Sequence, residues 1–173
     1  MAQINALVQH ILSEYSLPWD GVHGVSHWAR VLENGRRLAG QSGANLAVVE
    51  LFAVLHDSKR INEAIDDGHG QRGADFARLL RGQYFDLADA QFELLALACI
   101  DHTNGGTEAD ITVQTCWDAD RLDLYRVGIY PRAELLCTEA ARKPELFKWA
   151  VWRGRSRFVP ELVLEEWEIR SGD

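Results

Sequence analysis

Apolar residues recur every three or four positions along most of the chain, and no segment alternates apolar and polar residues as a half-buried strand would. This pattern predicts an all-α protein. Asn45 is a candidate cap for the third helix. With breaks at glycine, proline and asparagine, the pattern predicts helices over residues 4–15, 25–39, 46–56, 71–80, 86 or 89 to 102, 111–127, 132–141, 144–152 and 160–169.

The helical pattern continues without a repeat, a low-complexity stretch or a linker, so no domain boundary is predicted. A length of 173 residues suits one domain with a sizeable core. We therefore expect a single-domain helical bundle over residues 1–173.

The composition is that of a soluble globular protein, with 47% apolar and 25% charged residues. A formal net charge of −8 disfavours bulk binding to nucleic acid. The N-terminal segment lacks a basic region followed by a long apolar run, and the most apolar stretch, residues 46–55, is too short to span a bilayer. These features predict a cytoplasmic protein with no membrane partner.

Several ionisable residues fall on the apolar faces of the expected helices. His56 lies four residues after Phe52 on one such face, and Asp57 follows where the helix must end. Asp120 lies in the middle of an apolar stripe, whereas Asp118 is roughly 200° around the same helix and should face elsewhere. Asp120 is therefore expected to be the inward carboxylate.

His27 and His102 also align with apolar positions of their helices. Taken alone, a histidine on an apolar face is more often a hydrogen-bonded core residue, and an ion pair with Arg30 or Arg121 would satisfy Asp120. Together, however, these residues have no matching set of buried cations, and a buried carboxylate costs several kcal/mol unless it is compensated. A shared metal ion satisfies all of them.

In order, these residues resemble the H…HD…D signature of the HD-domain metal-dependent phosphohydrolases. The matching segments are His-Trp-Ala-Arg-Val at 27–31, His56-Asp57, and Asp-Ala-Asp-Arg-Leu-Asp at 118–123. The resemblance covers about residues 22–127 and implies an HD-type helical bundle on which the helices of residues 131–170 pack.

Two more histidines extend the resemblance to HD proteins that bind two metals. His69 opens a segment similar to the HxxxGA segment of HD-GYP phosphodiesterases, and His102 ends the next helix. The GYP element is missing, so HD-GYP specificity is not carried over. The resemblance implies a first metal on His27, His56, Asp57 and Asp120, and a second on His69 and His102 with Asp57 bridging.

The implied reaction is attack on phosphorus by a metal-activated water, in which Asp57 takes part. Lys59, Arg60, Arg72 and Arg30 are candidate cations for the phosphate, with Lys59 the best placed for a catalytic role. Each is more often a solvated surface charge.

Two residues near the expected metal ligands, His23 and Asp123, each allow two interpretations. His23 is either a general acid or substrate contact, or a residue that only shapes the entry to its helix. Asp123 is expected to support a metal ligand or to pair with a nearby arginine.

The histidine and carboxylate ligands suit a divalent transition metal, namely Mn, Fe, Co, Ni or Zn. The leading hypothesis is a phosphohydrolase acting on a small phosphate ester, including nucleotides. The alternatives are a di-iron oxygenase of HD type and a non-catalytic metal-binding module. Exposed tryptophans in the C-terminal third could form a contact between subunits, so an oligomer is also possible from the sequence.

Overall fold

The computed structural model describes residues 2–169, and the all-α prediction is confirmed within that range. An isolated bridge between Arg81 and Phe85 is the only β-type pairing there. The helices are α1 Ala2–Ser13, α2 Val25–Ser42, α3 Leu46–Leu55, α4 His69–Leu80, α5 Asp89–Asp101, α6 Ile111–Arg121, the 3₁₀ turns η1 Leu124–Val127 and η2 Ala133–Leu135, α7 Glu139–Arg142, α8 Pro144–Ser156 and α9 Glu161–Glu165.

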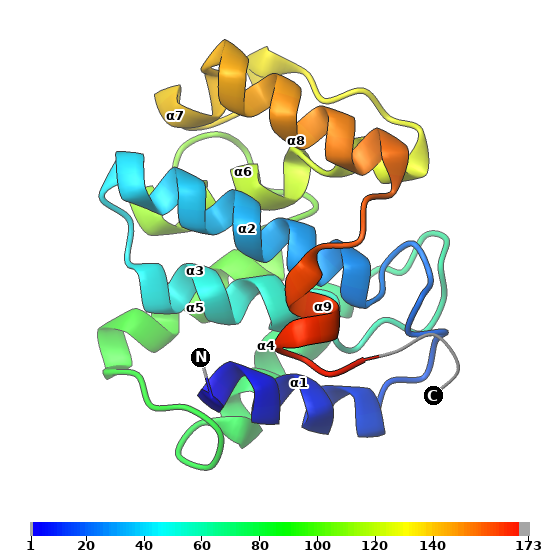
Figure 1. Ribbon diagram of the computed structural model, residues 1–173. Helices are drawn as coiled ribbons and strands as arrows, with labels where there is room; N and C mark the ends of the chain where they lie inside the picture. Colours follow the sequence, from blue (N-terminus) through cyan, green and yellow to red (C-terminus); the bar gives the residue numbers. More distant parts are fainter. Residues whose placement is uncertain (1, 170–173) are drawn as a thin grey trace.

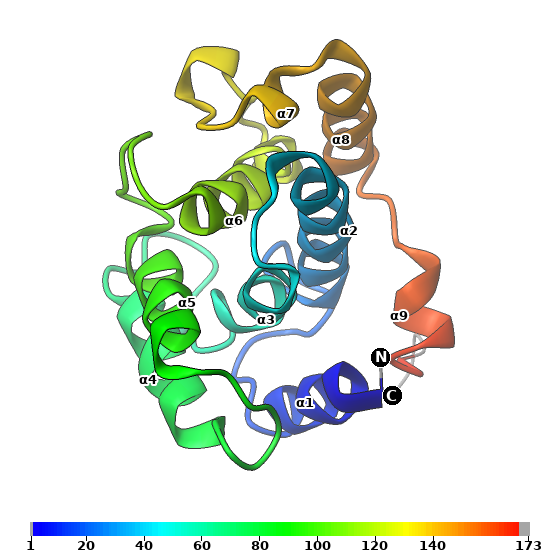
Figure 2. The same cartoon turned by 90° about the vertical axis from the view of Figure 1, so that its left-hand side faces the viewer.

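Helix α3 lies in the middle of the bundle. It packs against α2, α4, α5 and α6, which surround it in Figure 2. Its sequence, Leu-Ala-Val-Val-Glu-Leu-Phe-Ala-Val-Leu, is apolar nearly all round, and although Leu46 in the first turn is exposed, residues 51–55 are all buried. The bundle therefore buries the C-terminal end of α3, where His56 and Asp57 follow.

The other helices close the two ends of this core. Helices α7 and α8 lie at one end, against α2, and α1 lies at the other (Figure 1). Helix α9 comes back toward α1, where the side chain of Gln9 donates a hydrogen bond to the carbonyl of Trp167. The C-terminal segment thus packs along the core.

Local capping explains where two of the helices begin. The Asn45 side chain accepts a hydrogen bond from the Val48 amide, which confirms the predicted cap of α3. Helix α4 begins at His69, two residues before the predicted start, because Gly68 adopts a left-handed conformation (φ 85°) that turns the chain into the helix. His69 is therefore held at a helix end and not in a loop.

The predicted helix over residues 111–127 is wrong beyond Arg121. Helix α6 ends there, and the chain turns at Asp123 into the short η1, which Gly128 closes with φ 83°. The Asp123 carboxylate is fully buried against α2, and this contact replaces continued helical packing.

Two C-terminal helices are also shorter than predicted. The 132–141 helix is wrong, because the backbone is extended at Leu136 and Thr138, and Thr138 caps a separate α7 through the Ala141 amide. The 160–169 helix ends at Glu165, and Glu168 has a positive φ of 56°.

No helix in the described part of the chain combines the length and apolar character needed to cross a bilayer.

A pair of glycine substitutions tests the close packing of α4 on α5. A Cβ at Gly70 would lie 2.2 Å from the backbone oxygen of Cys99, whereas one at Gly40, late in α2, meets nothing within 4 Å. Gly70→Ala should lower the free energy of unfolding by about 1–3 kcal/mol, and Gly40→Ala should raise it by about 0.5–1 kcal/mol through helix propensity. Urea unfolding measures both, and equal effects would contradict this packing.

Candidate metal centre

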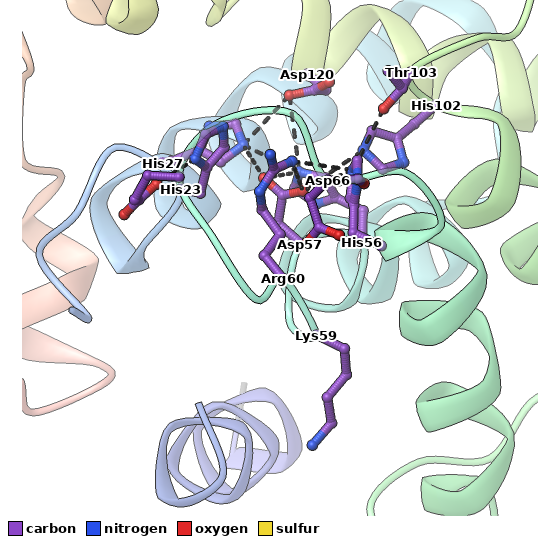
Figure 3. Close-up of polar contacts among 12 residues, drawn as sticks. His23, His27, His56, Asp57, Lys59, Arg60, Asp66, His102, Thr103 and Asp120 are labelled. Atoms are coloured by element: carbon purple, nitrogen blue, oxygen red, sulfur yellow. Dashed lines mark hydrogen bonds and ion pairs between the residues drawn. The ribbon is translucent and has the colours of Figure 1, made fainter. Parts of the chain in front are cut away.

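The structure brings six predicted ligands together from five helices. His27 lies in the first turn of α2, His56 and Asp57 follow α3, His69 begins α4, His102 follows α5, and Asp120 lies near the end of α6. All six side chains are buried. Figure 3 shows most of them converging, with dashed contacts across the group.

Each of the four imidazoles is oriented by a partner on its Nδ1 atom. The partner is a carboxylate or a backbone carbonyl, so Nδ1 carries the proton and donates it. The pairs are His27 with Asp123 at 2.8 Å, His56 with the Phe52 carbonyl at 3.1 Å, His69 with the Asp66 carbonyl at 2.6 Å, and His102 with the Cys99 carbonyl at 2.7 Å.

The remaining Nε2 atoms therefore carry lone pairs, and they face one another in two pairs. The Nε2 atoms of His27 and His56 are 3.1 Å apart, and those of His69 and His102 are 2.8 Å apart. Two acceptors at this distance repel unless a cation or a proton lies between them. Each pair is thus arranged to bind a positive charge.

Asp57 lies between the two histidine pairs. Its Oδ2 is 3.5 Å from His27 Nε2 and 3.6 Å from His56 Nε2. Its Oδ1 is 3.3 Å from His69 Nε2 and 3.7 Å from His102 Nε2. One carboxylate therefore offers one oxygen to each pair, which is how a carboxylate bridges two ions.

Asp120 completes the group around His27 and His56. Its Oδ1 lies 3.4 Å from His27 Nε2 and 3.8 Å from His56 Nε2. This oxygen is buried and has no hydrogen-bond partner among residues 2–169. A buried anionic oxygen without a donor fits a metal ligand.

The donor set as a whole fits divalent metals. Three overlapping groups of these side chains have ligand atoms within 4.8 Å of one another: His27, His56 and Asp57; His56, His102 and Asp120; and Asp57, His69 and His102.

Burial keeps the ligands in the protonation states that metals need. It lowers the pKa of His56 to about 3, and it also lowers the pKa of His69. Burial alone would raise the pKa of Asp120, but the charge of Arg126 together with those of His56, His27 and His102 outweighs it and brings that pKa to about 2. Neutral imidazoles and an ionised carboxylate are the metal-binding forms.

His102 behaves differently from the other imidazoles. Burial lowers its pKa, but the neighbouring Asp57 carboxylate, helped by the charge of Asp120 and the Cys99 carbonyl, raises it by more. A proton on His102 Nε2 relieves the contact with His69 when no cation does so.

Asp123 and Arg30 support His27 from behind. Besides accepting from His27, the Asp123 carboxylate receives two hydrogen bonds from Arg30, from Nε at 2.7 Å and Nη2 at 3.0 Å. The remaining Nη1 of Arg30 donates to the Phe158 carbonyl. The expected support role of Asp123 agrees with this geometry. The expected substrate contact of Arg30 does not, because its donors are engaged inside the protein.

Among the other predicted cations, Arg60 reaches the centre. Its Nη1 is 3.4 Å from Asp57 Oδ1 and 3.2 Å from His69 Nε2, and the side chain lines the cavity above the ligands.

Lys59 and Arg72 do not reach it. Lys59 extends toward α1 (Figure 3), where Nζ lies 2.6 Å from Glu14 and 3.8 Å from the ring centre of Phe76. Arg72 binds Asp66 and the Lys59 carbonyl, so it holds the loop that follows Asp57. This geometry corrects the expectation that Lys59 acts in catalysis and Arg72 contacts the substrate.

His23 lies at the edge of the same cavity. Its Nδ1 is 2.5 Å from a carboxylate oxygen of Glu63, and burial lowers its pKa. Glu63 was not predicted, because it follows His56 and Asp57 within a polar loop whose sequence has no periodicity.

Asp118 is buried like Asp120, so the expectation that Asp120 alone points inward is wrong. The two do face different ways, as predicted. The Asp118 carboxylate accepts hydrogen bonds at 2.7 Å from the amides of Cys137 and Thr138 and from the Thr138 hydroxyl. Asp118 thus fixes the C-terminal segment and takes no part in the metal group.

The ligands open onto a cavity of about 650 Å³. Thr103 and Arg126, both missed in the sequence, line it. An uninterrupted helix would have placed Arg126 about 240° around from Asp120. The end of α6 at Arg121 brings the two side chains to 3.7 Å instead.

Comparisons with known proteins give one informative match. The sequence matches no protein-family model and no curated protein. Among solved structures, the chain is similar to the crystal structure of a predicted HD superfamily hydrolase from an uncultured Thermotogales bacterium. The identity is 31%, the TM-score is 0.63, and the match covers 94% of this chain and 92% of the other.

Asp123→Asn tests the support of His27. The amide cannot serve as an anionic acceptor for both His27 and Arg30, so metal affinity should fall about 10- to 100-fold. Asp118→Asn is the matched control, because it alters a buried carboxylate outside the metal group and should lower stability while leaving metal affinity unchanged. Chelator-competition titration measures the affinity, and equal metal affinities for the two variants would contradict the assignment.

The metal-free protein should lose stability as the pH falls from about 6 to about 5. The unfolded His56 imidazole takes up a proton near 6.5 but the folded one only near 3, so protons favour the unfolded state in this window. The free energy of unfolding then falls by at most about 1.4 kcal/mol per pH unit for each such group. His23 and His69 act in the same direction.

Urea unfolding in the presence of a chelator measures this slope. His56→Gln removes one contributing group and should make the slope shallower. A wild-type stability that is constant or increases on acidification over this range would contradict the protonation states.

Proposed function

The chain belongs to the HD superfamily, and from that membership and its ligand geometry we propose that it is a metal-dependent phosphohydrolase acting on a small phosphate ester, nucleotides included. The observation that carries the proposal is Asp57, whose two oxygens are divided between two histidine pairs. This arrangement favours two metal ions. Bound there, divalent metals lower the pKa of water and polarise a phosphoryl oxygen.

The residues that would hold the first ion are His27, His56, Asp57 and Asp120, and those that would hold the second are His69, His102 and Asp57. The ligands are of borderline character and suit Mn, Fe, Co, Ni or Zn.

The chain's own residues would bind the phosphate and handle the proton. Arg60 lies beside Asp57 on the cavity wall and would contact a phosphate oxygen. His23, with Nδ1 held by Glu63, is neutral near pH 7 and keeps Nε2 free to accept a proton from the attacking water. The same atom would return the proton to the leaving oxygen.

A di-iron oxygenase is a second candidate, because the same bridging position of Asp57 also suits two iron ions. The two candidates differ in what they require. Phosphate release with Mn²⁺ under nitrogen supports the hydrolase, whereas substrate loss that needs both iron and oxygen supports the oxygenase.

Three further expectations from the sequence belong to this proposal. They are a cytoplasmic location, a single domain over residues 1–173 and a small phosphorylated substrate as the binding partner. An oligomer stays a prediction.

Metal stoichiometry in ligand variants tests the proposal. Wild-type protein should bind two ions per chain and release phosphate from a panel of small esters. The double variant His69→Ala with His102→Ala should keep one ion, because the His27 group is complete without them. Asp57→Ala should lose at least one ion and all hydrolysis, since it removes a ligand from both positions.

Elemental analysis gives the ion count, and circular dichroism checks that the helices remain. Lys59→Ala is the control, two residues after Asp57, and it should keep both ions and the hydrolysis because Lys59 points away from the centre. Full occupancy in Asp57→Ala would refute the bridging assignment, and a metal-replete wild type inactive on the whole panel would refute the hydrolase.

A further inference from the structure

Arg126 is a buried cation in the cavity that has an unused donor. Its Nε donates to the Val22 carbonyl at 3.0 Å, which anchors the guanidinium. Its Nη1 is buried and has no hydrogen-bond partner among residues 2–169, although Asp120 Oδ1 lies 3.7 Å away. The side chain is only 7% exposed. Leaving such a donor unpaired is costly, so a ligand atom is the expected partner.

The charges around Arg126 favour an anionic ligand. Asp123 is neutralised by Arg30, with which it makes two hydrogen bonds, and it also accepts from His27. One of the two proposed divalent ions is enough to balance the charges of Asp57 and Asp120. Of the other arginines that line the cavity, Arg132 pairs with Glu134 and Arg121 donates to backbone carbonyls. Arg126 and Arg60 then remain as the two positive charges beside the ligand group, in a chain whose net charge is −8. Two positive charges match a phosphate monoester dianion.

Several apolar side chains line the cavity beside Arg126. They come from η1 and the segment after it, and they are Leu124, Val127, Ile129, Tyr130 and Leu135. Ile129, Tyr130 and Leu135 are at least half exposed. Apolar side chains beside charged residues in one cavity suit a ligand with one ionic and one apolar part.

We infer that Arg126 binds the phosphate group of the substrate, and that the alcohol part of the ester carries an apolar or aromatic ring that lies against Tyr130. This inference rests on the proposed function and narrows its substrate class. Phosphate at Arg126 lies next to the ligand group of His27, His56 and Asp120, and the ring extends away along the segment of residues 127–135.

Binding experiments on manganese-loaded protein test both ends of the cavity. Arg126→Gln should weaken binding of inorganic phosphate about 10- to 100-fold, the usual effect of losing a charge-assisted contact. Arg126→Lys should restore part of it. Arg155→Gln is the control, because it removes one exposed positive charge that lies over Tyr125 and outside the cavity, and it should bind phosphate as the wild type does.

Two esters separate the ring from the phosphate. Tyr130→Ala should weaken binding and raise KM for phenyl phosphate by about tenfold while leaving glycerol phosphate unchanged. Arg126→Gln should affect both esters equally.

Unchanged phosphate affinity in Arg126→Gln would overturn the inference, and so would a loss of manganese from that variant, which would show that Arg126 only supports Asp120. Equal effects of Tyr130→Ala on the two esters would overturn the ring assignment. A wild type that hydrolyses neither ester but binds phosphate through Arg126 would refute the hydrolase and support the phosphate site.

Discussion

Four imidazole lone pairs and two carboxylates share one buried volume, and the rest of the structure depends on how they are compensated. Each neutral imidazole donates its Nδ1 proton outward, so the Nε2 contacts at 3.1 and 2.8 Å need a cation or an added proton between the two nitrogen atoms. The carboxylates add negative charge at the same place. Leaving such groups uncompensated costs several kcal/mol each. Arg60 reaches Asp57 and His69, but it leaves Asp120 Oδ1 and the contact between His27 and His56 uncompensated. Divalent cations satisfy all these groups together.

The bundle is built to hold these groups at the ends of its helices. His56, Asp57 and His102 directly follow α3 and α5, and His69 begins α4. At a helix end, the side chain can turn toward the centre while Nδ1 reaches a carbonyl of the last turn, as in His56 and His102. The close approach of α4 to α5 at Gly70 brings His69 and His102 together. The rigid, apolar α3 fixes Asp57 between the pairs.

The sequence predicted most of the helices, and it singled out the six residues that the structure brings together. His56 and Asp120 stand out as polar residues in apolar stripes, and the order of the histidines matches the HD pattern. It did not predict where α6 ends, because that end depends on Asp123 reaching α2, a contact distant in sequence. Because the helix was predicted to continue to residue 127, Arg126 was not expected to lie near Asp120. Lys59 was predicted at the metal site but pairs with Glu14 instead. This pairing depends on the position of α1 in the bundle, which hydrophobic periodicity does not predict.

Anomalous diffraction from crystals of the protein purified without added metal tests the central claim most directly. Data on both sides of the absorption edges of Mn, Fe, Co, Ni and Zn identify the ions and locate them. Two peaks are expected, one among His27, His56 and Asp120 and one between His69 and His102, with Asp57 contacting both. A map with no anomalous peak in this cluster after metal loading, and with each Nε2 atom hydrogen-bonded to a protein donor instead, would contradict that claim.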